Sequence, residues 1–479
     1  MDFIDIEARV EVIISAAHLD TWLGLEMRRG RKEEPIGILT YFGWTAAGVA
    51  GKNTTEEVVI HRLSVDDENL KESMTRIFNN DFPAIEGEGA SLSQEARYAA
   101  EQLRESVRWR EKEGKYAAGI PWKEGREGAA KVLNRVDSKS MAERRMWSLK
   151  RSMEKVPAKK EKAFSEMKKF IEKGRAEPLK EGKGDSEGTL PIWHLPCHIV
   201  YQKGKWRFCH DGRANAGGIC LNEQVIGDLN LMVPMLNPLT NLRKNLYAFG
   251  TDIESFFHNI LVDERDRDAF RFFWYEDEEM KRLVPYVFLA HIFGSSSSPT
   301  VTAYVLRHHA AKIREVYGEE VYKIINSFYV DDGAGGANSE EEYKKRKEQL
   351  TKAMEEGGFT LAKWKFSHPE AMGEEAHGEE SREKILGVVW NMKEDTLSIA
   401  IEEEEFEKTA ITPRQIVQMQ AKIFDPLGIG APFVLIGRRL TQKAMKGKWG
   451  WDIPVSKELQ EEFNAWAKSV LSQTFAAGE

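Results

Sequence analysis

The stretch SFYVDDGAGG, residues 327–336, constrains the chain more than any other. The apolar run 324–330 predicts a buried strand that ends in a hairpin turn at two adjacent aspartates, Asp331 and Asp332, and small residues follow at once. Two carboxylates this close repel each other unless a cation lies between them or one of them holds a proton. Asp is also common in turns, so a solvated pair is the alternative.

A third carboxylate has a similar setting. In LYAFGTDIESFFHNI, residues 246–260, a predicted strand runs into Asp252, with Phe256 and Phe257 just beyond it. If the two strands are neighbours, three carboxylates converge. Divalent cations such as Mg²⁺ prefer hard oxygen ligands. Two such ions, roughly 4 Å apart, activate an attacking hydroxyl and stabilise a leaving oxygen in phosphoryl transfer. The residues therefore predict a two-metal site.

Charge is unevenly distributed. The net charge of −8 argues mildly against a protein that coats nucleic acid. Residues 101–185 nevertheless carry an excess of about nine positive charges, and the run EEEEFE at 402–407 is acidic. Each run suits either a binding surface or a solvated face.

The order of elements predicts an α+β fold. From Thr189 onward, short strand-like runs alternate with helical stretches such as SPTVTAYVLRHHAAKIREVY, residues 298–317. Residues 51–185 are charged and helical in pattern, with a helix capped by Ser138 or Ser140, and the Gly-rich segment 180–188 predicts a linker. Helices are expected from Thr412 and from about Ser456.

Other sequence signals exclude several classes. No apolar run is long enough for a transmembrane helix, and the acidic N-terminus does not resemble a secretory signal. The three cysteines form no CxxC and suit a reducing compartment. The nearby histidines and cysteines fit no zinc-finger or zinc-knuckle spacing. They are His194, Cys197, His198, Cys209, His210 and Cys220.

Several motifs, in order, resemble those of reverse transcriptases. They are KWRFCHDGRA at 205–214, DIESFF at 252–257, FGSSSSPT at 293–300, YVDD at 329–332, GGFTLAKWK at 357–365 and ILGVVW at 385–390. Three segments are similar in sequence to polyproteins of BEL/Pao long-terminal-repeat retrotransposons. They are DIESFFHNILVDERDRDAFRFFW, GGFTLAKW and IFDPLGIGAPFVLIGRRL. The resemblance covers most of residues 150–470 and implies a right-hand polymerase of fingers, palm and thumb.

The resemblance also implies site roles. Asp252 and Asp331 would bind two Mg²⁺ or Mn²⁺ ions, with Asp332 assisting and the Ile253 carbonyl as a further ligand. The dNTP triphosphate would meet Arg207, whose planar fork suits phosphate, together with Lys203 or Lys205. Phe257 would stack under the deoxyribose and block a 2′-hydroxyl. Gly294, Ser298 and Pro299 would shape the floor beneath the incoming base and the template, and Tyr329 would contact the template-primer. Either Lys363 or Lys365 would protonate the pyrophosphate.

The basic tract is assigned to template on charge alone. Arg144, Arg145, Lys150 and Arg151 cluster on one predicted helix, so we expect them to contact the template backbone. A solvated helix is the alternative. Phe293, in front of the glycine of FGSSSSPT, departs from the more polar residue usual in retroviral members, and the extra serines make the template floor small and polar.

The N-terminal residues resemble half of another retroelement enzyme. VEVIISAAHLDTWLGLEMRRG followed by PIGILTYFGWTAAG is similar to the C-terminal half of the aspartic protease, with Ser15 in place of the usual glycine. The catalytic Asp-Ser/Thr-Gly occurs nowhere, so proteolysis is not expected. Past FDPLG we see neither an RNase H carboxylate cluster nor an integrase. We therefore expect a protease remnant at 1–50, a charged connector at 51–185, fingers and palm at 186–400, and thumb helices at 401–479.

The expected activity is RNA-directed DNA polymerisation from a primer 3′-hydroxyl. Expected partners are an RNA or DNA template-primer, dNTPs and other segments of the polyprotein, in the cytoplasm within retroelement particles and without a membrane. Two alternatives remain open: a non-catalytic descendant that binds nucleic acid, and a two-metal phosphohydrolase. The second leaves the fingers and FDPLG motifs unexplained.

Overall fold

The computed structural model describes residues 26–29, 36–40, 43–47, 94–179, 189–202, 204–227, 233, 235–373, 382–399, 411–447, 449–471 and 476–477. The chain forms two compact units, Met1–Ala90 and Ser91–Glu479. In the first, β1 (Glu26–Arg29), β2 (Ile36–Thr40) and β3 (Gly43–Ala47) form an antiparallel sheet. The strand-like character predicted for EPIGILTYFGW is thus confirmed, whereas RVEVIIS and Ser15 lie outside the described residues.

The second unit begins with a helical and strand-containing stretch. Its elements are α3 (Gln94–Ser106), β4 (Arg108–Arg110), β5 (Lys115–Ala118), α4 (Gly125–Leu133), α5 (Ser138–Lys155), α6 (Pro157–Glu172) and β6 (Ala176–Pro178). Helix α5 is capped by the Asp137 side chain, which accepts from the Ser140 amide, so the predicted serine cap is wrong. Ser138 is instead buried and bonded to His194, which removes it from the cap.

The middle of the unit contains a four-stranded sheet and a two-stranded hairpin. The sheet has the order β6-β13-β12-β7, and β8 pairs with β9 antiparallel. The bounds are β7 (His194–Leu195), β8 (Cys197–Gln202), β9 (Lys205–His210), β12 (Arg271–Tyr275) and β13 (Leu283–Phe288). Between β9 and β12 lie α7 (Leu221–Gln224), α8 (Leu236–Arg243), β10 (Tyr247–Ile253), η1 (Phe256–Asn259), β11 (Leu261–Val262) and η2 (Arg267–Phe270).

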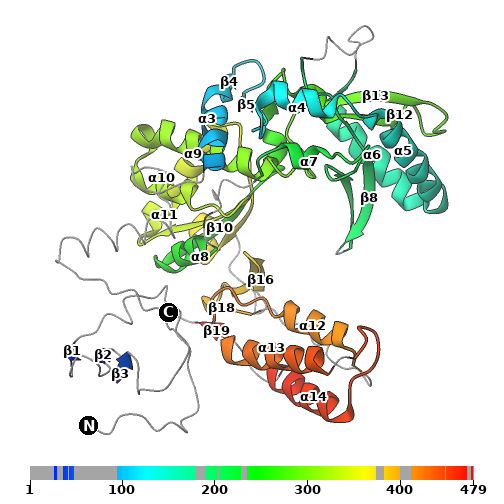
Figure 1. Cartoon of the computed structure of the whole chain (residues 1–479). Helices are drawn as coiled ribbons and strands as arrows, with labels where there is room; N and C mark the ends of the chain where they lie inside the picture. Colours follow the sequence, from blue (N-terminus) through cyan, green and yellow to red (C-terminus); the bar gives the residue numbers. More distant parts are fainter. Residues whose placement is uncertain are drawn as a thin grey trace. The chain divides into compact units, whose positions relative to one another are not determined.

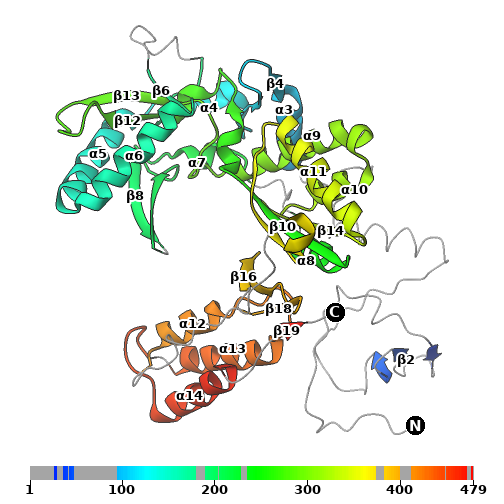
Figure 2. The same cartoon turned by 180° about the vertical axis from the view of Figure 1, so that it is seen from behind.

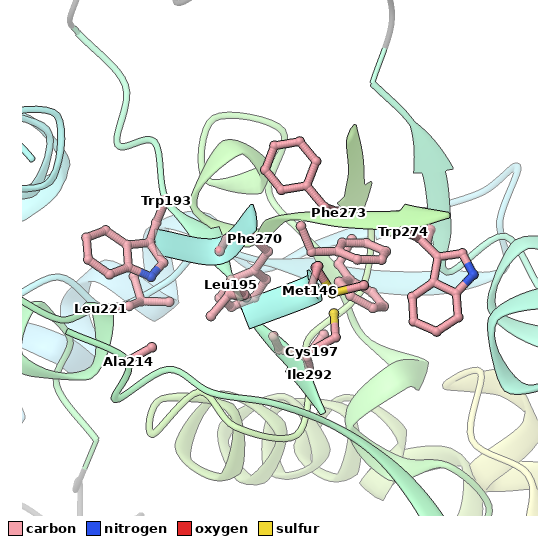
Figure 3. Packing of buried hydrophobic residues seen from close by; sticks show 14 of the residues in the cluster. Met146, Trp193, Leu195, Cys197, Ala214, Leu221, Phe270, Phe273, Trp274 and Ile292 are labelled. Atoms are coloured by element: carbon pink, nitrogen blue, oxygen red, sulfur yellow. The ribbon is translucent and has the colours of Figure 1, made fainter. Parts of the chain in front are cut away.

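A large aromatic core lies beneath this sheet. Met146 of α5, Leu195 of β7 and Trp274 of β12 are all buried in it, and Figure 3 shows them grouped with Trp193, Cys197 and Phe270. Strand β12 reads RFFWY and is buried on both faces, which explains its continuous apolar run. Helices α5 and α6 bury one face each in the same core.

A second sheet, of order β14-β10-β15, carries the predicted carboxylates. Its strands β14 (Asp332–Ala337) and β15 (Leu361–Phe366) alternate along the chain with α9 (Ser298–Tyr317), α10 (Glu319–Asn326), α11 (Glu340–Glu356) and η3 (Pro369–Met372). Helices α9, α10 and α11 lie together against this sheet (Figures 1 and 2). Because strand residues alternate between faces, Phe249 joins the core under these helices, whereas Ala248 joins a separate core with α8.

The apolar run 324–330 is not the strand that the sequence predicts. Residues Glu319–Asn326 form α10, and Val321, Ile324 and Ile325 share its buried face at helical spacing. The chain then turns, and only a single bridge, Tyr329 to Asp332, precedes β14. Packing of α10 against α9 favours the helix over the strand that the β-branched residues suggest.

The expected connector is part of the same compact unit. Strand β5 pairs in parallel with β11, and β6 pairs with β13. Leu103 and Tyr116 contribute to the core under α9, and Met146 to the aromatic core. The described residues 94–179 are therefore integral to the unit, which differs from the expected division at residue 185. The linker predicted at 180–188 lies outside the described residues.

The C-terminal part contains β16 (Arg382–Ile385), β17 (Val388–Asn391), β18 (Thr396–Ser398), α12 (Pro413–Lys422), α13 (Ala431–Lys446), α14 (Lys457–Leu471) and β19 (Ala476–Ala477). Thr412 forms a capping box with Gln415, which confirms the predicted helix start. Ile416, Phe463 and Trp466 pack in a core of their own. Within the described residues, no helix is both long and apolar enough to span a membrane.

Candidate active site

Two of the three predicted carboxylates face each other across a strand pair. Asp252, near the end of β10, lies directly opposite Asp332, the first residue of β14. Directly paired residues of an antiparallel ladder project from the same face. Asp331 is held beside them because the Ile253 amide donates to the Asp331 carbonyl at 2.8 Å. The backbone thus brings Asp252, Asp331 and Asp332 to the same end of the sheet, with Ile253 adjacent to them.

A tight turn positions Asp331 and Asp332. The Tyr329 and Asp332 backbones bond to each other at 2.9 and 3.0 Å, and Val330 between them has a φ of 56°. A β-branched residue at positive φ is strained, and such strain clusters at functional sites.

The small residues after the pair allow close packing behind it. A Cβ on Gly333 would lie 2.1 Å from the Phe328 ring, and one on Gly335 would lie 2.8 Å from Ile324. Strand β14 is glycine-rich because α10 and the turn pack directly against it.

The electrostatics identify a crowded anionic site. Burial, together with the charges of Asp331 and Asp252, raises the pKa of Asp332 to about 6. Burial and Asp252 also raise the pKa of Asp331. Such mutual shifts are typical of carboxylates that share a cation or a proton, as at many catalytic centres.

Lysine 363 neutralises part of this charge. Its Nζ lies 2.7 Å from Asp252 Oδ2, and the hydrogen bond to Asp252 raises the lysine pKa. Lys365 instead donates to the Lys384 carbonyl and lies 3.4 Å from Glu383. The sequence left open which lysine acts on pyrophosphate; the structure brings Lys363 to Asp252, while the charges of both lysines lower the pKa of Asp332.

The donors suit a divalent cation in kind, but they do not enclose one. Across the described part of the chain, no group of three His, Cys, Asp or Glu side chains is arranged to hold a metal ion unaided. Carboxylate oxygens are nevertheless the ligands that Mg²⁺ and Mn²⁺ prefer. The Lys363 ammonium, 2.7 Å from Asp252, shows that a cation is accommodated at this position.

The ring predicted to discriminate sugars is covered. Phe257, in η1, is only 8% exposed, and its ring centroid lies 4.5 Å from that of Phe293, which is 49% exposed. Phe256 is buried and packs on Phe359, as expected for the neighbour that faces the core. Phe293 thus forms the outer layer over Phe257, a relationship that sequence reasoning missed although it singled out Phe293.

The loop before α9 is fixed by close backbone packing. Gly294 has a φ of +111°, and a Cβ there would lie 2.0 Å from the His210 carbonyl oxygen of β9. Asn222 donates to the Gly294 carbonyl and accepts from the Ser296 amide, both at 3.0 Å. Asn222 had no sequence signal. Ser298 is buried at the start of α9, followed by Pro299, so both lie where the motif predicts.

The predicted phosphate and template cations are more dispersed. Arg207 is exposed on β9, opposite Val200, while Lys203 and the Lys205 side chain lie outside what the structure describes. On α5, Arg145 pairs with Asp211 at 2.9 Å, and Lys150 donates to the Met280 carbonyl. Arg144 and Arg151 are exposed on the same helix, and contact of the four residues with the template stays a prediction.

The C-terminal part of the chain matches a known protein family. Residues 412–477 match the family described as the Pao retrotransposon-like RNaseH-like domain. This confirms the resemblance to Pao retroelements that the sequence predicts and supports a segment of a retroelement polyprotein. The family description names an RNaseH-like domain where the sequence predicts thumb helices, and the thumb assignment stays a prediction. No curated protein matches the chain.

Two solved structures are similar at low identity. The foamy viral protease-reverse transcriptase dRH in complex with ds DNA has a TM-score of 0.43 and 16% identity, over 64% of this chain and 47% of that one. The foamy viral protease-reverse transcriptase in complex with RNA/DNA hybrid has a TM-score of 0.45 and 14% identity, over 67% of this chain and 38% of that one. The chain thus spans less than half the length of either.

Proposed function

We propose that the chain is the polymerase segment of a Pao-like retroelement polyprotein, which copies an RNA or DNA template into DNA. The observation that carries the proposal is the pairing of Asp252 with Asp332 beside Asp331, in the motif order of reverse transcriptases. The retroelement match of residues 412–477 supports the same class.

Asp252, Asp331 and Asp332 would hold two Mg²⁺ or Mn²⁺ ions. When bound, such ions activate the primer 3′-hydroxyl and stabilise the leaving pyrophosphate oxygen. Asp332, whose pKa is raised to about 6, would be ionised when it holds such an ion. Lys363, whose Nζ lies 2.7 Å from Asp252 Oδ2, would be the residue that donates a proton to pyrophosphate.

Primer extension tests the proposal. The purified chain should extend a DNA primer annealed to RNA when Mg²⁺ or Mn²⁺ and dNTPs are present. Asp331→Asn should abolish extension and leave binding of the template-primer intact. Glu348→Gln is a matched control, because Glu348 is an exposed carboxylate of α11 away from the site. No metal-dependent extension by wild type, with Asp331→Asn indistinguishable from it, would refute an active enzyme.

A second candidate is a non-catalytic descendant that binds nucleic acid. The ion pair between Lys363 and Asp252 favours it, because the lysine occupies a carboxylate that a metal needs. Two results together would support this candidate over the polymerase: the chain binds a template-primer without extending it, and Mn²⁺ does not bind at Asp252.

A further inference from the structure

One cation of α9 lacks a counter-charge among the described residues. Arg307 lies on α9 and is half-buried, and its Nη1 is buried without a hydrogen-bond partner among the described residues. Burial lowers the pKa of Arg307 to about 10. Arg314, on the same helix, shows the ordinary arrangement, since it pairs with Glu319 at 2.8 Å.

Arg307 lines a small pocket next to the aspartate turn. The walls are largely apolar and come from α9, from α10 and from the segment that leads into the turn. They include Pro299, Leu306, Ile325, Phe328 and Val330. Asn326 is the other polar residue that lines the pocket. The pocket therefore joins the start of α9, with Pro299, to Val330, the neighbour of Asp331.

A guanidinium held among apolar walls without an anion is unfavourable. Buried charges are ordinarily paired, and an unmet donor in such a setting costs free energy comparable to a lost hydrogen bond. An arginine fork suits an anion with several oxygens, above all phosphate. The position of Arg307 is thus better explained by a partner that arrives with a ligand than by packing alone.

We propose that the Arg307 pocket binds a backbone phosphate of the nucleic acid, with Asn326 as a second donor. This inference rests on the proposed function, since it assigns one contact of the bound template-primer. The pocket lies beside Val330, so the phosphate belongs to the stretch of duplex next to the primer terminus. The site is distinct from the three carboxylates and binds without metal or dNTP.

Binding of a primed RNA–DNA duplex in EDTA, without dNTP, tests the proposal. Each neutralised phosphate adds about 0.9 to the slope of log affinity against log salt for duplex DNA. Arg307→Gln should therefore lower the magnitude of the slope by roughly 0.9, and Lys312→Gln by less. Lys312 is the matched control, because it is an exposed cation on the same helix. Equal slopes for wild type and Arg307→Gln would overturn the proposal.

A phosphate scan locates the contact. Single methylphosphonates, which remove one backbone charge, are introduced on each strand near the primer terminus. Wild type should lose affinity at a position to which Arg307→Gln is insensitive. No such position on either strand would count against the site. A parallel measurement with dATP alone separates the anion sources: loss of dATP affinity in Arg307→Gln, with unchanged duplex binding, would assign the pocket to the nucleotide and overturn the proposal.

Thermal unfolding separates this role from a structural one. Because the free chain leaves the guanidinium unpaired, Arg307→Met should unfold at the same temperature as wild type or higher. A clear decrease, together with an unchanged salt slope, would mean that Arg307 supports the fold only. The outcome is independent of polymerase activity: a lower slope in a chain that never extends primers would sustain the phosphate site and refute the polymerase.

Discussion

Asp252 and Asp332 stand directly opposite each other in the β10–β14 pair. Like charges at directly opposed positions destabilise a sheet, by a few tenths of a kcal/mol to about 1 kcal/mol on exposed surfaces. Here the positions are partly buried, and the pKa of Asp332 is raised to about 6. The fold therefore carries an electrostatic strain that a divalent cation, as proposed for this site, would relieve.

Removal of this charge should stabilise the free chain. A carboxyl whose folded pKa is about 6, against an ordinary value of 3.8, binds more protons when folded, so its penalty is present above pH 6 and disappears below about pH 4. Asp332→Asn should therefore raise the free energy of unfolding by ~1–2 kcal/mol at pH 7.5 in EDTA, with no gain at pH 4. Denaturant unfolding at both pH values measures it. An equal gain at pH 4 would contradict the electrostatic cause.

Lys363 should compete with divalent metal. Its ammonium is 2.7 Å from Asp252, so a metal that binds this carboxylate has to displace it. Because exposed ion pairs contribute about 0.2–1 kcal/mol, Lys363→Gln should tighten Mn²⁺ binding up to ~5-fold, whatever happens to activity. Electron paramagnetic resonance of free Mn²⁺ measures the affinity. Lys352→Gln serves as the control, since Lys352 is an exposed cation of α11. Weaker Mn²⁺ binding in Lys363→Gln would show that the lysine organises the site instead.

Gly294 should tolerate no side chain. A Cβ there would lie 2.0 Å from the His210 carbonyl oxygen at a φ of +111°. Gly294→Ala should lower the free energy of unfolding by ~2–4 kcal/mol, because the clash adds to the backbone strain. Gly204→Ala is the matched control: its φ is +75°, but nothing lies within 4 Å of the added carbon, so strain alone remains. Similar losses for the two variants would mean that the loop before α9 moves away from β9 at little cost.

Sugar discrimination should depend on the Phe257–Phe293 pair. Phe257→Val removes the ring that supports Phe293, so the outer ring can shift and admit a 2′-hydroxyl. We expect rNTP incorporation to rise far more than dNTP use falls, measured as the ratio of kcat/KM values. Phe256→Ala should instead lower the free energy of unfolding by ~3–5 kcal/mol and leave the ratio unchanged, since Phe256 is buried in the core. If the two variants show each other's expected phenotype, the roles assigned to Phe256 and Phe257 are displaced by one residue.

Local patterns predicted those parts of the site that depend on a single element. The strand ending at Asp252, the helix from Ser298 and the cap at Thr412 follow from apolar alternation, helical spacing and a capping box. The run 324–330 was misread because Val321, Ile324 and Ile325 also suit a strand, and contact with α9 decides for α10.

Contacts between distant segments could not be predicted in the same way. The partner of Lys363, the tilted ring contact between Phe257 and Phe293, and the bonds of Asn222 join segments between 36 and 111 residues apart, for which one sequence gives no distance. The roles expected for these motifs came from the family resemblance, whereas the contacts between their side chains became known only from the structure.

The pairing of β5 with β11 has a consequence for how the chain folds. Ala117 pairs with nearby Arg108 on one side but with distant Leu261 on the other, and Ala176 of β6 pairs with Phe288 of β13. During synthesis the first half of the unit must therefore wait on the ribosome, with its apolar surfaces uncovered, until the later strands emerge. Chains dominated by such distant pairings fold slowly and expose strand edges to aggregation. We therefore expect slower translation through residues 180–260 to lengthen the exposure of these apolar surfaces and to increase aggregation of the nascent chain.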